Sequence, residues 1–394
     1  MKGKQAMIFN ESERLSSIPP YLFAEIDEII KKKKEDGFDV ISLGIGDPDI
    51  KTPDIVVEEL KKQADNPENH RYPSSYGLKA LKKAASDFYK KRFNVEIDPE
   101  REVISLWGSK EGIANIAYTF INPGDIVLAP DPSYPVYKIG TMFAGGSTVT
   151  VPLREENNYL IDFNEIDLNI AKKAKIIHAN YPNNPTSAGC GIDFFEKLSS
   201  FAMENNIIVC HDNAYGDIYS EQSAKPVSFL NARNSKETGI EFYSLSKSFN
   251  MTGWRISIAV GNPSVISSLG KYKSNVDSGV FNAIQLAAAK ALENYDELTM
   301  ENNKIYNRRR SKVWGLLDKI GLSYFKSGNT IYVWTKVPEG YTSSSFAKLL
   351  LDKASVVVTP GSAYGLYGEG FFRISLTISD ERLEEAIDRI SNVF

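Results

Sequence analysis

Short runs of β-branched and apolar residues alternate along the middle of the chain with amphipathic stretches of helical period. This alternation is typical of βαβ units, in which strands form a mostly parallel sheet that helices cover. It predicts helices at 110–121, 194–205 and 263–272. It predicts strands at 103–107, 126–129, 148–151, 176–180, 207–212, 241–245 and 256–260. We therefore expect an α/β fold with a doubly wound, mostly parallel sheet of seven strands flanked by helices.

The pattern changes after about residue 285. A long charged helix is predicted at 296–320, followed by three shorter strands near 331–334, 355–358 and 371–376 and an amphipathic segment at 380–390. We interpret this part as a smaller α+β domain that the N-terminal segment completes. The expected bounds are 1–47 for the N-terminal arm and part of the small domain, 48–285 for the large domain and 286–394 for the small C-terminal domain.

Composition and charge exclude several classes of function. The 394 residues carry 46 Lys and Arg against 50 Asp and Glu, which gives no electrostatic case for nucleic-acid binding. The sequence has neither a secretory leader nor an apolar stretch of 18 residues, so we expect a cytoplasmic protein without membrane association. Two cysteines and three scattered histidines predict neither a disulfide framework nor a metal site.

Common nucleotide and hydrolase motifs fail on inspection. Gly44-Ile-Gly46 lacks the third glycine of the dinucleotide-binding motif, and the sequence has no phosphate-binding loop of the GxxxxGK[ST] type. Ser244-Leu-Ser-Lys247 matches the SxxK motif of serine acyl-transfer enzymes, but the accompanying SDN and KTG elements are missing. We therefore sought another role for Lys247.

Charged residues at the ends of two predicted strands indicate a cofactor. Lys247 and Asp212 both follow buried strands, where an unpaired charge is costly. In pyridoxal phosphate enzymes an aspartate pairs with the pyridinium nitrogen, and a lysine holds the aldehyde as a Schiff base. The Gly108-Ser109-Lys110 turn opens a predicted helix whose N-terminus suits the phosphate. Further candidate phosphate ligands are Ser244, Ser246 and Arg255.

The chain resembles the class I/II aminotransferases of the fold-type I pyridoxal phosphate superfamily, and its motifs are similar to the LL-diaminopimelate aminotransferase-like subgroup. The resemblance implies an aspartate aminotransferase-like fold with a large cofactor-binding domain. The motifs that carry it are Gly46-Asp-Pro-Asp49, Arg71-Tyr-Pro-Ser-Ser-Tyr-Gly-Leu78, Tyr181-Pro-Asn-Asn-Pro-Thr186, Asp212-Asn-Ala-Tyr215, Ser244 to Arg255 and Gly370-Phe-Phe-Arg373. The chain departs from the family's usual Asn-Pro-Thr-Gly at Thr186-Ser-Ala-Gly189.

The resemblance also implies a role for each motif residue. Lys247 would hold the cofactor aldehyde, Asp212 would keep the ring nitrogen protonated, and Tyr134 would stack on the ring. Tyr215 and Asn184 would bond the ring 3′-oxygen. The phosphate would be bound by Ser109, Lys110, Ser244, Ser246 and Arg255. Tyr72 would reach the phosphate of the neighbouring subunit, which implies a homodimer with shared active sites.

The substrate side follows from the same resemblance. Arg373 would clamp the α-carboxylate, together with the Gly46 backbone and Asn184, and Tyr21 and Asn282 match substrate contacts of the diaminopimelate subgroup. The implied activity is ping-pong transfer of an amino group between an L-amino acid and a 2-oxo acid, of LL-diaminopimelate type. The alternatives are donors such as methionine, alanine, aspartate or an aromatic amino acid, and, less favoured, a pyridoxal phosphate lyase on the same fold.

Overall fold

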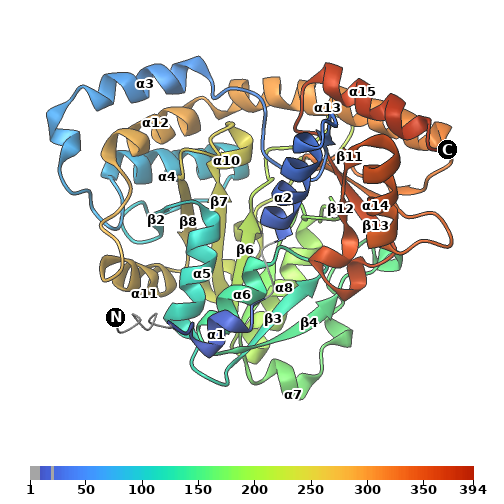
Figure 1. Cartoon of the computed structure of the whole chain (residues 1–394). Helices are drawn as coiled ribbons and strands as arrows, with labels where there is room; N and C mark the ends of the chain where they lie inside the picture. The colour runs from blue at the N-terminus through green and yellow to red at the C-terminus, as the bar shows by residue number, and fades with distance from the viewer. Residues whose placement is uncertain (1–8, 19–21) are drawn as a thin grey trace, which may run out of the picture.

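The computed structural model describes residues 9–18 and 22–394, and a seven-stranded sheet forms its centre (Figure 1). The β8 strand runs antiparallel to both of its neighbours, and all other neighbouring pairs in this sheet are parallel. In spatial order the strands are β2 (Val103–Leu106), β8 (Ser257–Gly261), β7 (Gly239–Ser244), β6 (Ile208–Asn213), β5 (Ala174–Ala179), β3 (Ile126–Asp131) and β4 (Ser147–Pro152). The seven predicted strands and the predicted sheet are confirmed.

Helices cover both faces of this sheet, because successive side chains of each buried strand point into opposite cores. Phe242 of β7 packs with α5 and α11 on one face, whereas Tyr243 packs with α4, α8 and α12 on the other. The helices of this unit are α3 (Asp54–Ala64), α4 (Lys79–Phe93), α5 (Ser109–Phe120), α6 (Val136–Phe143), α7 (Leu168–Ala171), α8 (Ile192–Asn205), α9 (Ser235–Thr238), α10 (Leu245–Ser248), α11 (Pro263–Ser274) and α12 (Asn282–Glu293).

A smaller unit stands beside the large sheet, and the long helix α13 (Tyr295–Lys319) runs between the two (Figure 1). Its antiparallel sheet has the order β12 (Thr359–Pro360), β13 (Phe371–Ser375), β10 (Tyr332–Lys336) and β9 (Tyr324–Phe325). Two helices, α14 (Ser343–Ala354) and α15 (Asp380–Ser391), contact α13, each other or this sheet. The long helix and the terminal helix match the sequence predictions.

The strand predicted near 355–358 is present as the short β11 (Val356–Val357), but sequence analysis missed a second short strand, β12, that follows it directly. The two strands have different partners. The β11 strand pairs in parallel with β1 (Ile41–Ser42), whereas β12 pairs with β13, so the chain changes sheets here. A hydrophobic run alone carries no information on such a change of partner. Through β1, the N-terminal segment joins the core of the small unit, where Ile41 and Leu43 are buried.

The remaining helices, α1 (Glu13–Ser16) and α2 (Leu22–Glu35), precede β1. Lys32, Lys33 and Lys34 lie in the last turn of α2. Within residues 9–18 and 22–394, no helix is long and apolar enough to cross a membrane.

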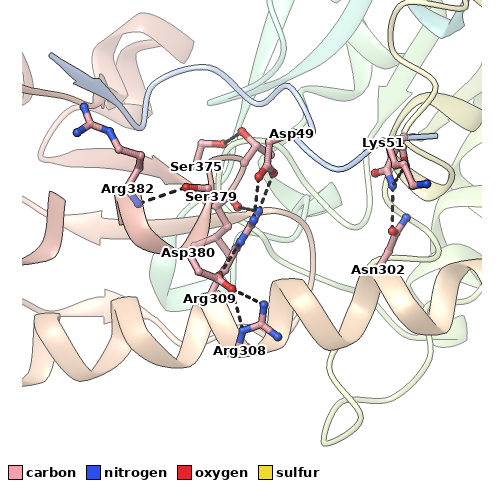
Figure 2. A network of polar contacts seen from close by, with 12 residues as sticks. Asp49, Lys51, Asn302, Arg308, Arg309, Ser375, Ser379, Asp380 and Arg382 are labelled. Atoms are coloured by element: carbon pink, nitrogen blue, oxygen red, sulfur yellow. Dashed lines mark hydrogen bonds and ion pairs between the residues drawn. The ribbon is translucent and has the colours of Figure 1, made fainter. Parts of the chain in front are cut away.

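Arg309 of α13 ties the N-terminal segment to the small unit (Figure 2). Its guanidinium donates to both carboxylate oxygens of Asp49, at 2.7 and 2.8 Å, and to Asp380 at the start of α15, at 3.1 Å. The side chain of Arg309 is only 5% exposed, whereas that of its neighbour Arg308 is 51% exposed. Removal of the Arg309 charge would leave two partly buried carboxylates without this partner.

We expect Arg309→Met to lower the free energy of unfolding by about 2 kcal/mol, because the substitution keeps the apolar stem but takes the guanidinium away from Asp49 and leaves Asp380 with Arg308 alone. The matched control is Arg308→Met, which removes an exposed ion pair with the same Asp380 and should change stability by less than about 0.5 kcal/mol. The midpoint of thermal unfolding of the two variants measures the difference. Equal destabilisation by both substitutions would contradict this account.

Candidate active site

The parallel pairing of β6 with β7 brings the predicted site together at one edge of the large sheet. Asp212 lies on the same face of β6 as Cys210, and Ser244 lies on the same face of β7 as Phe242. Helix α5 covers this face, and its first residue is Ser109. Since parallel strands end at the same edge, polar residues from two strands and a helix N-terminus meet there.

A pocket opens at this edge, and residues of both units line it. It gathers most of the predicted site residues: Gly46, Ser109, Lys110, Tyr134, Asn184, Asp212, Tyr215, Ser244, Ser246, Lys247, Arg255 and Arg373. Sequence analysis did not single out Ile45, Asp47, Asn180, Ala214, Thr252 and Tyr332, which line it as well.

Two predicted residues that the structure describes are not part of this pocket. Tyr72 is 90% exposed on the surface of the chain. Asn282, the first residue of α12, is buried away from the pocket lining. Tyr21 lies outside the described residues.

Lys247 reaches the pocket from the short helix α10, whose N-cap is Ser244. Its Nζ donates to the carbonyl oxygen of Gly46, 2.5 Å away. Burial lowers the pKa of Lys247 to about 8; Arg373 and Arg255 act in the same direction, and Asp47 opposes them. A substantial fraction of this amine is therefore neutral near pH 8, which makes it able to act as a nucleophile or a base.

The Asp212 carboxylate has one oxygen that accepts a hydrogen bond and one that is able to accept a further donor. Its Oδ2 accepts a hydrogen bond from the hydroxyl of Tyr137 at 2.8 Å, whereas Oδ1 is buried and has no hydrogen-bond partner among the described residues. Burial raises the pKa of Asp212 to about 6, against the lowering effects of Tyr137 and His211. A cationic N–H donor at Oδ1 would satisfy this oxygen and stabilise its negative charge.

Arg373 links the two units across the pocket. It extends from β13 of the small unit and donates from Nη1 to Oδ1 of Asn184, at 2.7 Å, and from Nη2 to the carbonyl of Gly44, at 2.6 Å. Asn180 supports this arrangement, since its side chain accepts from the Asn184 backbone and donates to the carbonyl of Asp212. The guanidinium is thereby fixed with its charge facing the pocket.

The N-terminus of α5 forms an anion-binding corner. The Oγ of Ser109 is buried and has no hydrogen-bond partner among the described residues. Arg255 stands directly against the preceding turn, since a Cβ on Gly108 would come within 2.5 Å of its Nη2. Gly108 also has a φ of +86°, which favours glycine. A helix N-terminus, a hydroxyl and a guanidinium together suit a phosphate group.

A buried cluster of polar side chains around Glu241 lies behind the site, on the opposite face of β7. Glu241 is fully buried and its Oε2 accepts hydrogen bonds from His211, at 2.7 Å, and from the Ser228 hydroxyl, at 2.9 Å. Its Oε1 accepts from Tyr89, at 2.7 Å, and from Asn213, at 3.0 Å. Although burial acts to raise the pKa of Glu241, these bonds hold it below its usual value. The cluster joins α4, β6 and β7 beneath Asp212 and Lys247.

Three of the residues that sequence reasoning missed make hydrogen bonds within the site: Tyr137, Asn180 and Tyr332. Asn180 carried a readable signal, because it is a polar residue at the end of a predicted buried strand. Tyr137 follows Tyr134 by three residues, but only the register of α6 directs its hydroxyl to Asp212. Tyr332 reaches the site from the small sheet, so its sequence neighbourhood gave no sign of this contact.

Comparison with known proteins agrees with this fold and site. Residues 39–390 match the family model of aminotransferase class I and II. An LL-diaminopimelate aminotransferase of Aquifex aeolicus is 54% identical over 386 residues, covering 98% of this chain and all of the relative. Substrate-bound BacF of Bacillus subtilis is 38% identical and superposes with a TM-score of 0.94, covering 98% of each chain. A mutant aspartate aminotransferase of Thermus thermophilus is 25% identical, with a TM-score of 0.91 over 98% of this chain and all of that one.

Fold and site thus define a class of two-unit α/β proteins in which a buried lysine, a buried aspartate and an arginine surround one pocket. The chain belongs to the class I and II aminotransferases. It is accordingly a transferase, as the resemblance implied, and its fold is that of aspartate aminotransferase.

We expect the Lys247 amine to react with a small aldehyde with a half-maximal rate near pH 8, because only the neutral amine is a nucleophile. Reductive methylation of protein stripped of bound small molecules, followed by peptide mass spectrometry, measures this rate as a function of pH. Exposed Lys61 serves as the internal control, since its hydrogen bond to Glu58 holds its pKa above the usual value. Titration of both amines over the same pH range would contradict the assignment.

Proposed function

We propose that this protein is a pyridoxal 5′-phosphate-dependent aminotransferase whose amino donor is LL-diaminopimelate. The observation that carries the catalytic part is the convergence of Lys247, Asp212 and Arg373 on one pocket. The donor is inferred from the 54% identity to a relative with this activity over almost the whole chain.

The residues present fit the cofactor at two buried atoms that need a partner. Oδ1 of Asp212 suits the protonated ring nitrogen, and Oγ of Ser109 suits a phosphate oxygen at the α5 N-terminus. The other phosphate ligands in this proposal are Lys110, Ser244, Ser246 and Arg255, all of which line the pocket. Tyr134 lines it too and would cover one face of the ring.

The orientation of Asn184 is informative for the ring 3′-oxygen. Because Oδ1 of Asn184 already accepts from Arg373, its Nδ2 group is the one that can donate to this oxygen. Tyr215 can donate as well, since burial raises the pKa of its hydroxyl well above the usual value and keeps it protonated. Two neutral donors would then stabilise negative charge on the ring oxygen.

The cofactor, when bound, supplies an aldehyde that takes up the amino group and a ring that accepts the electron pair released at the substrate Cα. Lys247 Nζ would remove the Cα proton and return it to the cofactor side, because it is a buried amine of this pocket with a pKa of about 8. Arg373 and the Gly46 backbone would bind the α-carboxylate, with a planar guanidinium suited to a bidentate contact. Closure of the small unit would exclude water during this proton transfer.

We also propose that the units are bounded as 1–47 with 286–394, and 48–285. The pairing of β1 with β11 supports the assignment of the N-terminal segment to the small unit. We place the protein in the cytoplasm, where Cys190 and Cys210 would stay reduced, since both are free thiols.

The proposed donor is tested by adding amino acids one at a time to the cofactor-loaded protein without any oxo acid. LL-diaminopimelate should abolish the visible absorption band, with a kcat/KM at least about 10-fold above those of methionine, alanine, aspartate and tyrosine. Preference for one of these others would reassign the donor within the family. Product formation beyond one equivalent per site without any oxo acid would instead indicate a lyase, because an aminotransferase without an acceptor stops after one half-reaction.

Lys247→Ala should fold and bind the cofactor non-covalently, but lose at least about 10²-fold in turnover, because no other group is placed to move the Cα proton. Steady-state assays and the absorption spectrum of the variant test this together. Near-normal turnover would exclude Lys247 as the base.

The active form in this proposal is a homodimer in which Tyr72 reaches the phosphate in the partner's site. Its 90% exposure is expected of an interface residue, and Val276 and Phe281 are exposed as well. Asn282 lies outside the chain's own pocket, so a substrate contact by Asn282 would also have to be made in the partner's site.

Co-expression of Tyr72→Ala with Lys247→Ala chains tests the shared site. Mixed dimers would hold one site with an intact Lys247 and an intact partner tyrosine, so random pairing should restore roughly a quarter of wild-type activity at low cofactor concentration. The control is the same mixture prepared from separately purified, non-exchanging dimers. Restoration in that control, or none in the mixed dimers, would contradict a shared site.

A further inference from the structure

Tyr332 is a buried residue of the small sheet that contacts the polar centre of the pocket. It lies on β10 and is 3% exposed. The register of β10 with β13 sets Trp334 opposite Arg373, so Tyr332 is the diagonal neighbour of Arg373 on the same face. The Arg373 guanidinium carbon is 3.9 Å from the centre of the Tyr332 ring, a distance suited to a cation–π contact.

The hydroxyl of Tyr332 meets residues that approach the cofactor side. It is 3.0 Å from the hydroxyl of Tyr215. It also stands directly over Gly46, where a Cβ would come within 2.0 Å of it. The Gly46 carbonyl in turn accepts from Lys247. One side chain therefore contacts the cofactor half of the pocket with its hydroxyl and the carboxylate half with its ring.

The number of hydroxyl protons on Tyr215 and Tyr332 determines the direction of the hydrogen bond between them. Each hydroxyl has one proton to donate. If Tyr215 donates its proton to the ring 3′-oxygen, as in the proposed function, then Tyr332 has to be the donor and the Tyr215 oxygen the acceptor. A hydroxyl that accepts a hydrogen bond is polarised and becomes a stronger donor in a buried chain of hydrogen bonds.

We propose that Tyr332 is a positioning residue that strengthens the hydrogen bond from Tyr215 to the cofactor through its hydroxyl and holds the substrate-binding guanidinium of Arg373 through its ring. This inference rests on the proposed function, because it needs a cofactor oxygen next to Tyr215. It assigns two separable effects to two parts of one side chain.

The hydroxyl effect predicts a spectroscopic shift. When Tyr332 donates to Tyr215, Tyr215 donates more strongly to the negatively charged 3′-oxygen. That oxygen then stabilises a proton on the Lys247 nitrogen less well, so the pH at which the visible band changes is lowered. Tyr332→Phe removes the hydroxyl and keeps the ring over Arg373. We expect this variant to raise the midpoint of the spectral titration by about half a pH unit, the size of one modest hydrogen bond.

The ring effect predicts a change in substrate binding. Tyr332→Leu removes ring and hydroxyl together, and should raise the KM for the amino donor about 10-fold beyond the KM of the Phe variant, with a smaller change in kcat. Tyr324→Phe on the neighbouring strand β9 is the matched control, because its hydroxyl contacts Asp318 and not the pocket. The control should change neither the spectral midpoint nor KM.

The decisive experiment is a double-mutant cycle on the cofactor-loaded protein, with Tyr215→Phe, Tyr332→Phe and the double variant titrated by absorbance. Because Tyr332 acts through Tyr215, its substitution should shift the midpoint in the wild-type background and have no effect once Tyr215 is Phe. An unchanged midpoint in Tyr332→Phe, or an equal shift in both backgrounds, would overturn the inference. Failure of the wild-type protein to develop a visible band with pyridoxal phosphate would instead overturn the proposed function.

Discussion

The parallel pairing of β6 with β7 is the constraint on which the rest of the site depends. It ends two buried strands at one edge and sets Asp212 and Ser244 on the same face, over which α5 lies. The short helix α10 then continues from Ser244 and turns Lys247 back toward that face. A one-residue shift of register would move Asp212 to the opposite core, where apolar side chains of α4 and α8 pack.

The site also needs the small unit, which brings a second guanidinium to the pocket beside Arg255 of the large unit. Arg373 provides it from β13, and its contacts with Asn184 and Gly44 make the bridge between the units polar and specific. Arg309 holds the segment that contains Gly46 in place from the other side, through Asp49. The carboxylate side of the pocket is thus built by four segments that are far apart in sequence.

The sequence predicted the parts of the fold and site that depend on local pattern. The seven strands of the large sheet were readable from periodicity, and Lys247 and Asp212 stood out because each is a charge at the end of a buried strand. Tyr332 and Tyr137 could not be found in this way. The contact of Tyr332 depends on the register between two strands of the small sheet, and that of Tyr137 on the rotation of a short helix. The change of partner between β11 and β12 likewise depends on long-range pairing that a local sequence pattern does not contain.

The buried Glu241 cluster has a consequence for the dynamics of the enzyme. It binds α4, β6 and β7 to one another through hydrogen bonds that are out of contact with water, directly behind Asp212. Local opening of these strands would expose an ionised carboxylate whose partners are lost one after another, which makes partial unfolding there costly. The backbone amides of β6 and β7 should therefore exchange with solvent only in the rarest, most global openings of the chain. The part of the active site that the large sheet provides is in this sense rigid.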